Sequence, residues 1–325
     1  MFKDFLKNRF YILKVRNRFS AEVQISQREL LLKYQQWRNK GTLPSIDDTG
    51  FRVFSQYEED GKLLFILSVI GMKNKTFVEI GSDDGINSNC ANLALNHGYH
   101  GLFLDGNPKA IKRGERLYGK YPHPWMYAPK FKCAKVQAEN INALLTEAGL
   151  SGDIDVLSID IDGNDYWVWN ALEAVSPNVV IIETHVEFGM RNIVVPYDPN
   201  YFFPGKHPVY HGASPIAMVN LAKKKGYRLV GANELGFNFI FVKPTSLQSY
   251  SLNPLSLSND TLYLSNGNNA FMGDLSFSSS SVSGGNIIIS SGTGTFTVPQ
   301  GVTFIVFEMY GGGGGGGSGG YSGCG

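Results

Sequence analysis

Short apolar runs alternate with helical segments from residue 55 to residue 244, and this alternation limits the folds open to the chain. Runs such as VVIIE (Val179–Glu183) carry almost no polar residue. Strands that are buried on both faces have this composition, because helices cover both sides of a parallel sheet. The pattern therefore predicts an α/β fold. The candidate strands are Thr76–Ile80, Gly101–Leu104, Cys133–Gln137, Val156–Ile161, Val179–Glu183, Tyr227–Gly231 and Phe237–Val242.

The last two candidate strands and the helix before them have clear local signals. Only ANELG (residues 232–236) separates the two strands, which is short enough for an antiparallel hairpin at a sheet edge. The preceding helix has Ser214 as a candidate N-cap, Pro215 in its first turn and Gly226 at its C-terminal end.

The stretch FVEIGSDDGINSN (Phe77–Asn89) predicts a ligand loop after the first strand, with backbone N–H groups and a helix start near the ligand. The dinucleotide pattern G-x-G-x-x-G does not fit, because Gly81, Asp83 and Ile86 fill its three glycine places. No Gly-Lys-Ser/Thr of a phosphate-binding loop follows. Carboxylates at Asp83 and Asp84 would repel a pyrophosphate. S-adenosylmethionine (SAM) carries a sulfonium, an ammonium and no phosphate, so it suits this loop better than NAD or ATP.

Polar residues also end the next three candidate strands. Asp105 lies twenty residues after Gly85, where an acidic side chain can accept hydrogen bonds from both ribose hydroxyls. Glu139 and Asn140 follow the third run and are placed to meet an adenine amino group, and Asp160 ends the fourth. Ligands bind outside the carboxyl ends of such strands. Four polar strand ends in succession favour one adenosyl site over four unrelated helix caps.

Several stretches resemble a class I SAM-dependent methyltransferase close to the FkbM-like group: FVEIGSDDG, GLFLDGNP, SIDIDGNDYWVW and GYRLVGANELGFNFIFV. The resemblance covers residues 54–242 and includes the preceding FSQYEEDG. It implies a Rossmann-like seven-stranded sheet with helices on both faces and an antiparallel last strand, and SAM as the cofactor.

The same resemblance implies a cofactor site at the strand ends. Glu79, Gly81 and Gly85 would form the loop on the methionine side of SAM, and the polar residues after the second and third strands would hold the ribose and the adenine. Asp83 departs from the family pattern, in which a glycine is common at that place. The candidate cofactor-binding residues are Glu79, Gly81, Asp84, Gly85, Asp105, Glu139, Asn140 and Asp160.

Two residues are candidate catalytic bases. Methyl transfer to a hydroxyl needs an aligned acceptor and a group that takes up its proton. Asp162 follows the fourth strand, and His185 follows the fifth and belongs to the residue type that titrates near neutral pH. The alternative interpretation is structural, with Asp160 capping the next turn and Asp165 capping a helix. The aspartates and His185 could share a metal ion, but their spacing is not diagnostic, and no metal is assigned.

The long segment 186–212 follows the fifth strand and is rich in Tyr, Phe and His. Loops of this length in a compact domain are commonly lids or binding loops. Aromatic faces with interspersed polar groups suit a saccharide or another flat hydroxyl acceptor. The alternative is a loop that only covers the sheet edge. DIDGND after the fourth strand differs from the Asn/Asp-Pro-Pro-aromatic motif of DNA N-methyltransferases, and no Pro-Cys pair occurs, so DNA methylation is disfavoured.

The composition changes at both ends of this region. Residues 1–40 hold ten Lys and Arg against three Asp and Glu, and their apolar positions fit an amphipathic helix that packs on the domain behind it. A membrane-surface arm or an arm for an anionic partner is the alternative. The apolar positions are Val23, Leu30, Leu31, Tyr34 and Trp37.

No Lys, Arg or His follows Lys243, and the remaining segment is rich in Ser, Asn, Gly and Thr. Within it, GTFTVPQGVTFIVFEMY alternates in the manner of a β hairpin or small sandwich, and a low-complexity glycine run follows. This part resembles glycine-rich modules of bacteriophage tail fibres. The sequence thus predicts a basic helical segment (1–45), a methyltransferase domain (46–244) and a Ser/Gly-rich β module with its tail (245–325).

The totals exclude several classes. A net charge of +1 argues against a nucleic-acid binder. The sequence contains no stretch of eighteen apolar residues, so no membrane span is predicted. The N-terminus has too many charges for a signal peptide, and the three cysteines form no disulfide or metal pattern. We expect a cytoplasmic protein, or a virion component if phage-encoded. A non-catalytic structural protein with a methyltransferase-like domain and a fibre-like tail remains the alternative function, and the oligomeric state stays open.

Overall fold

The computed structural model describes residues 15–120, 128–205, 207, 209–244, 257–258 and 261–262. The expected β module and glycine-rich tail lie outside these residues, apart from the two-residue strands Leu257–Ser258 (β8) and Thr261–Leu262 (β9), which pair with each other antiparallel. Residues 1–14, the start of the basic helical segment, also lie outside them. Among the described residues, no helix combines the length and the apolar character needed to cross a bilayer.

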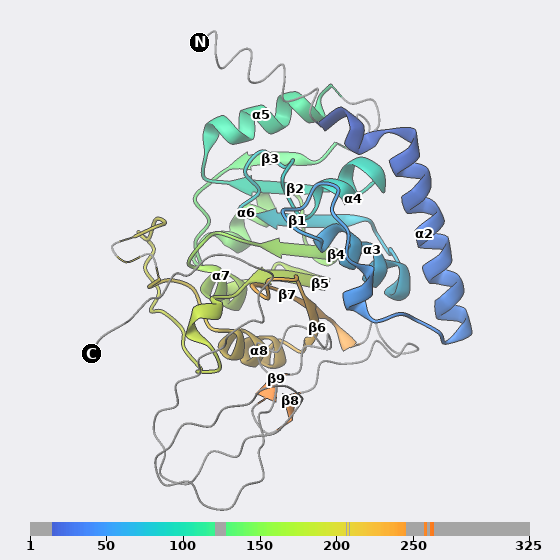
Figure 1. The fold of residues 1–325 in the computed structure, drawn as a ribbon. Coiled ribbons are helices and arrows are strands. Elements are labelled where there is room, and N and C mark those ends of the chain that lie inside the picture. The colour runs from blue at the N-terminus through green and yellow to red at the C-terminus, as the bar shows by residue number, and fades with distance from the viewer. Residues whose placement is uncertain are drawn as a thin grey trace, which may run out of the picture. The chain divides into compact units, whose positions relative to one another are not determined.

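A seven-stranded sheet with the order β3-β2-β1-β4-β5-β7-β6 forms the centre of the fold (Figure 1). Strands β1 to β5 are parallel, and β7 is antiparallel to both of its neighbours. This confirms the Rossmann-like sheet with an antiparallel last strand and the hairpin at its edge. The strands are Thr76–Ile80 (β1), His100–Asp105 (β2), Lys130–Cys133 (β3), Gly152–Ile159 (β4), Val175–Glu183 (β5), Arg228–Ala232 (β6) and Asn238–Val242 (β7).

Helices cover both faces of the sheet, as predicted, and each face has its own apolar core. In β5, Val179 and Ile181 belong to one core, and Val180 and Ile182 belong to the other, which explains why VVIIE is apolar throughout. The first face carries α3 (Glu59–Ile70), α4 (Ala91–Asn96) and α5 (Pro108–Tyr118), and the second carries α6 (Ile141–Glu147), α7 (Asp165–Ala171) and α8 (Pro215–Lys224).

The third strand differs from the prediction. It spans Lys130–Cys133 rather than Cys133–Gln137, and it pairs only with β2, at the edge of the sheet. The strand is short and only partly buried: Phe131 packs against the first core between two exposed or partly exposed lysines. The more apolar run that suggested a strand is the irregular connection to α6.

The basic N-terminal region contains α2 (Ala21–Lys40), preceded by a short 3₁₀ turn, and packs against α3. The Tyr34 ring is buried with its centroid 5.0 Å from that of Phe65, and the Arg38 guanidinium donates to the carbonyls of Ser68 and Val69. The predicted packing of this helix on the domain is therefore confirmed.

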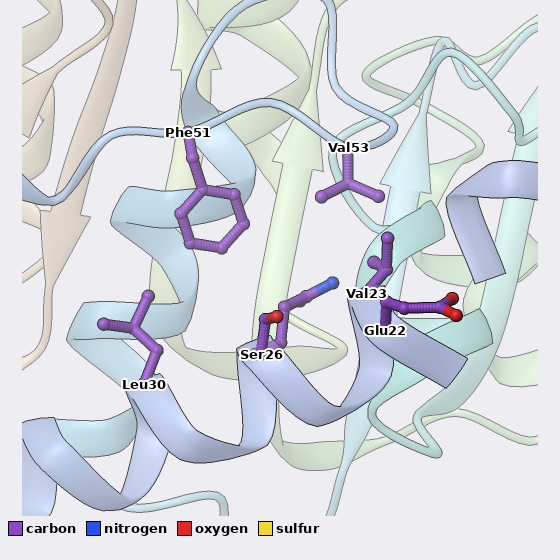
Figure 2. A pocket seen from close by; sticks show the side chains of 7 residues that line it. Glu22, Val23, Ser26, Leu30, Phe51 and Val53 are labelled. Carbon is purple, nitrogen blue, oxygen red and sulfur yellow. The ribbon is translucent and has the colours of Figure 1, made fainter. Parts of the chain in front are cut away.

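A cavity of about 300 Å³ lies between α2 and the extended segment that leads to α3 (Figure 2). Its lining is mostly apolar, and it contains none of the candidate site residues. The lining residues are Glu22, Val23, Ser26, Gln27, Leu30, Phe51 and Val53.

Candidate functional site

The loop after β1 is pressed against the end of β4. Gly81 has a φ of +85°, and a Cβ added to it would lie 1.6 Å from the carbonyl oxygen of Asp160. Its N–H and that of Ser82 donate to the carbonyl of Leu104 in β2 at 2.9 and 3.1 Å. The loop therefore lies close to the ends of three neighbouring strands, which only a glycine at position 81 permits.

Glu79 points into the protein behind this loop. Its buried carboxylate accepts hydrogen bonds from the Ser88 hydroxyl at 2.8 Å and from the N–H groups of Asn89 and Cys90, both at 2.9 Å. Burial raises the pKa of Glu79, and these hydrogen bonds act in the opposite direction. In this structure Glu79 fixes the start of α4 and the shape of the loop.

Asp105 joins β2 to the same loop. One of its oxygens accepts from the N–H of Asp83 at 2.8 Å, and the other accepts from the N–H of Asn107 at 2.7 Å. The side chain is partly exposed, and each carboxylate oxygen can accept a further hydrogen bond. Its position and free acceptor capacity suit a ligand with neighbouring hydroxyls.

Arg113 of α5 explains how the loop tolerates two aspartates. Its Nε lies 2.5 Å from the buried carboxylate of Asp84, and its Nη2 lies 3.1 Å from Asp83. Burial and the charge of Asp84 raise the pKa of Asp83, and Arg113 opposes them. Asp84, predicted to bind cofactor, is thus turned to Arg113 and to the N–H of Ile86 at 3.1 Å. The sequence analysis missed Arg113, since a single basic residue in a helix carries no signal.

The two residues expected at the adenine occupy the N-terminus of α6. The Asn140 side chain accepts from the N–H of Gln137 at 2.8 Å and donates to the carbonyl of Lys135 at 2.9 Å, so it closes the local turn. Glu139 is exposed and accepts from the Tyr197 hydroxyl at 2.5 Å. Both lie just beyond β3, but only Glu139 presents a charged group at the surface.

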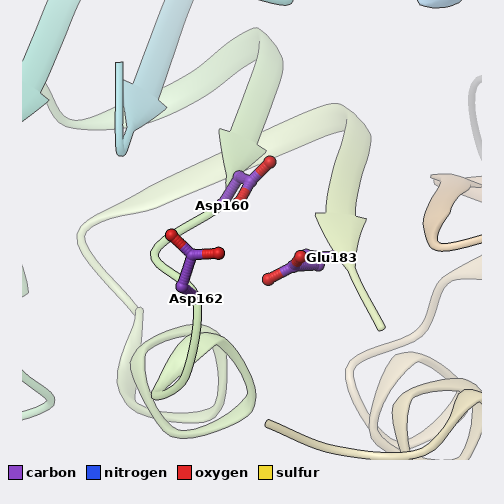
Figure 3. A group of neighbouring side chains, drawn as sticks. All are labelled: Asp160, Asp162 and Glu183. Atoms are coloured by element: carbon purple, nitrogen blue, oxygen red, sulfur yellow. The ribbon is translucent and has the colours of Figure 1, made fainter. Parts of the chain in front are cut away.

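Three carboxylates gather where β4 and β5 end (Figure 3). Asp160, Asp162 and Glu183 each contribute an oxygen, and these oxygens lie within 4.8 Å of one another. Asp160 and Glu183 are partly buried and Asp162 is exposed. Burial and then the neighbouring carboxylates raise the pKa of Asp160 well above its ordinary range and that of Glu183 to about 10. Their oxygens could hold a proton or an oxygen-preferring cation.

Asp165 has a structural part in the same turn. Its buried carboxylate accepts from the N–H groups of Ile161 and Gly163, both at 2.8 Å. Burial raises its pKa to about 6, and these hydrogen bonds oppose the shift. The alternative interpretation of Asp165 as a helix cap is not what the structure has: Asp165 is the first residue of α7, and its carboxylate binds the backbone of the preceding turn. It holds the turn in which Asp162 adopts a left-handed φ of +53°.

His185 lies near the carboxylates, but both ring nitrogens face acceptors. Nδ1 lies 3.0 Å from Glu187, and Nε2 lies 3.2 Å from the carbonyl of Val209. The carbonyl of Val209 can only accept, so Nε2 is assigned the hydrogen. Nδ1, the nitrogen that could take up a proton, then faces the carboxylate of Glu187. A role as a base therefore requires His185 to leave Glu187.

Segment 186–212 crosses the carboxyl edge of the sheet. The indole N–H of Trp167 donates to the carbonyl of Val195 at 2.9 Å, and the Gln137 side chain donates to the carbonyl of Pro199 at 2.9 Å. The Tyr201 ring lies over Gly163, where an added Cβ would come within 2.4 Å of it. The segment thus covers the turn that carries Asp162. Among its described residues, the exposed large hydrophobic side chains are Val186, Met190, Phe202, Phe203, Val209 and Tyr210.

No family model matches the sequence, and no curated protein matches it. Several solved structures are similar in fold. An O-methyltransferase from Bacillus cereus in complex with S-adenosylhomocysteine (SAH) is 17% identical, with 66% of this chain and 91% of that chain covered and a TM-score of 0.38. The O-methyltransferase TomG from Streptomyces achromogenes, in complex with SAM, is 18% identical, with coverages of 66% and 89% and a TM-score of 0.37. Magnesium protoporphyrin IX methyltransferase from Synechocystis, with bound SAM, is 11% identical, with coverages of 57% and 77% and a TM-score of 0.36.

Proposed function

We propose that this chain is a SAM-dependent methyltransferase of the FkbM-like type that methylates a hydroxyl group, with a saccharide as the acceptor class. One observation carries the proposal. The turn from Gly81 to Gly85 packs on the end of β4 and is tied to Asp105, and the carboxylates of Asp160, Asp162 and Glu183 stand at the same edge of the sheet.

The residues of the loop fit an adenosyl ligand. Asp105 has acceptor capacity for ribose hydroxyls, and the close contact at Gly81 brings the loop to the strand ends. The Ser82 hydroxyl is buried without a hydrogen-bond partner among the described residues. A bound ligand would supply that partner, since an unpaired buried polar group costs about 1–3 kcal/mol.

The acceptor side of the site is the turn after β4. SAM, when bound, supplies a methyl group on a positively charged sulfur. Asp162 is proposed to take up the proton of the acceptor hydroxyl, because it is the exposed member of the carboxylate group. His185 is the second candidate base, once its contact with Glu187 opens. The exposed rings of Phe202 and Tyr210 on segment 186–212 offer apolar faces for a sugar.

The domain assignment belongs to the same proposal. Residues 46–244 would form the catalytic domain, residues 1–45 a basic helical segment that packs on it, and residues 245–325 a separate module of the tail-fibre type. A cytoplasmic location is proposed with it.

Binding of SAM and SAH to the purified protein, measured by calorimetry, tests the proposal. We expect one site per chain, at least tenfold weaker binding in Asp105→Ala because the ribose loses its acceptor, and no binding of NAD. Asp153→Ala is the matched control, since Asp153 is an exposed carboxylate at the opposite end of β4. If millimolar SAM does not bind, or binds equally well to Asp105→Ala, the non-catalytic alternative replaces this proposal.

A further inference from the structure

Three polar side chains form a row across neighbouring strands at the carboxyl edge of the sheet. Asp160 directly follows β4, Glu183 ends β5 and Asn238 begins β7. Ile159 pairs with Ile182, so the next residues of these parallel strands, Asp160 and Glu183, are neighbours, and Glu183 pairs with Asn238. Paired residues leave a sheet on the same face. The face is the one covered by α3, because Ile181 and Ile240, two residues away, belong to that core.

Asn238 is held in one orientation. It is 3% exposed, and its amide nitrogen lies 3.1 Å from Glu59, a buried residue of α3. A carboxylate only accepts, so the NH₂ group must face Glu59. Glu59 is itself fixed by the N–H of Tyr57 at 3.0 Å and by the Asn233 side chain at 3.1 Å. The Asn238 amide oxygen is therefore turned away from Glu59, and it has no hydrogen-bond partner among the described residues.

We infer that Asp160, Asp162 and Glu183 bind a divalent cation, with the Asn238 amide oxygen as a fourth ligand, directly or through one water. Carboxylate and amide oxygens are the ligands that Mg²⁺, Mn²⁺ and Ca²⁺ prefer. A cation would offset the repulsion among three carboxylates and would give the Asn238 oxygen a partner.

The oxygen separations are compatible with one shared ion. Two oxygens that bind one Ca²⁺ at about 2.3–2.6 Å lie at most about 5 Å apart, and for Mg²⁺ at about 2.1 Å the limit is about 4.2 Å. The carboxylate oxygens lie within 4.8 Å of one another, so every pair lies within the span of one Ca²⁺, whereas one Mg²⁺ binds them only where no pair exceeds about 4.2 Å. A role for the ion in orienting the acceptor hydroxyl rests on the proposed function, whereas its binding does not.

The experiment is a titration of the full-length protein with Mn²⁺, followed by electron paramagnetic resonance, and with Ca²⁺, followed by calorimetry, both without SAM. We expect one site per chain. Asp162→Asn and Glu183→Gln should weaken Mn²⁺ binding at least tenfold because each removes a charged ligand, and Asn238→Leu about tenfold, since partners around a metal commonly affect affinity about 10–100-fold. Asp153→Asn removes the same charge at the other end of the sheet and should change affinity less than twofold. Far-UV circular dichroism verifies that each variant is folded.

Two results would overturn the inference. One is the absence of Mn²⁺ and Ca²⁺ binding to the wild-type protein at millimolar concentration. The other is binding that Glu183→Gln and Asn238→Leu leave unchanged, which would place the ion elsewhere. Because SAM is absent, either result leaves the proposed methyltransferase function to be judged by the SAM and SAH titration.

Discussion

Gly81 and Gly226 require glycine to different degrees: both need a left-handed backbone, and Gly81 also needs the absence of a side chain. Both have a positive φ, +85° and +80°. A Cβ at Gly81 would collide with the backbone of Asp160, whereas a Cβ at Gly226 has no atom within 4 Å. The left-handed conformation alone costs an L-residue about 1–2 kcal/mol. At Gly81 the contact between two strand ends adds to that cost.

We predict that Gly81→Ala abolishes SAH binding and lowers the free energy of unfolding by clearly more than Gly226→Ala does. The reason is that the loop must withdraw from β4 to admit the methyl group. Urea unfolding and calorimetry with SAH measure the two effects. Gly226→Ala, the control, should cost about 1–2 kcal/mol and leave SAH affinity unchanged. Wild-type SAH affinity in Gly81→Ala would show that the loop does not shape the site.

At the scale of elements, buried amides join α2 to α4. The side chains of Gln27 and Asn92 exchange two hydrogen bonds, at 3.1 and 2.8 Å, and Nε2 of His97 lies 2.7 Å from the Gln27 amide oxygen. α4 begins where Glu79 holds residues 88–90. The N-terminal helix is thus linked, through α4, to the proposed cofactor loop.

This junction predicts a pH dependence of stability. Burial, and then the charges of Lys75 and Arg28, lower the pKa of His97 to about 4. An unfolded histidine takes up its proton near pH ~6.5. The folded protein binds fewer protons than the unfolded chain between these values. The stability that neutral His97 contributes to the folded protein is therefore fully present above pH ~6.5 and is lost as the pH falls towards 4.

Urea unfolding at pH 7.5, 6 and 5 tests this pH dependence. The free energy of unfolding of His97→Gln should fall less than that of the wild type over this range, because the Gln side chain does not titrate. His207→Gln, at an exposed histidine, should follow the wild type. Parallel pH profiles for His97→Gln and the wild type would contradict the prediction.

At the scale of the whole molecule, the sheet is complete at Val242 and α2 covers α3. We therefore predict that a chain ending at residue 244 binds SAH within twofold of the full-length affinity. A chain that starts at residue 46 should unfold at a lower temperature, because it exposes apolar surface such as Phe65 that packs on Tyr34. Calorimetry with SAH and thermal unfolding measure these effects.

Each truncation has an outcome that would contradict the domain proposal. A large loss of SAH affinity on removal of residues 245–325 would place part of that segment in the site. Unchanged thermal stability on removal of residues 1–45 would show that the contacts of α2 contribute nothing to the folded domain.

The sequence by itself determined the sheet and the edge at which the proposed site lies. Apolar runs indicated strands buried on both faces, five residues indicated the terminal hairpin, and polar strand ends indicated one ligand edge. These features depend on neighbours along the chain. The carboxyl ends of parallel strands share an edge, so the placement of Asp105 and Asp160 at one edge followed from the topology alone. The strand β3 was misplaced because it has four residues, none of them fully buried, and so lacks a continuous apolar run.

Only the tertiary structure decided which polar groups meet. Arg113 neutralises Asp84 from 29 residues away, and Asn238 is fixed by Glu59 across a separation of 179 residues. Asn140, which the sequence suggested for the cofactor, and His185, which it suggested as a base, are turned to local partners. A sequence pattern reports periodicity and burial, whereas a hydrogen bond requires two atoms within about 3 Å, and that distance is set by how the elements pack.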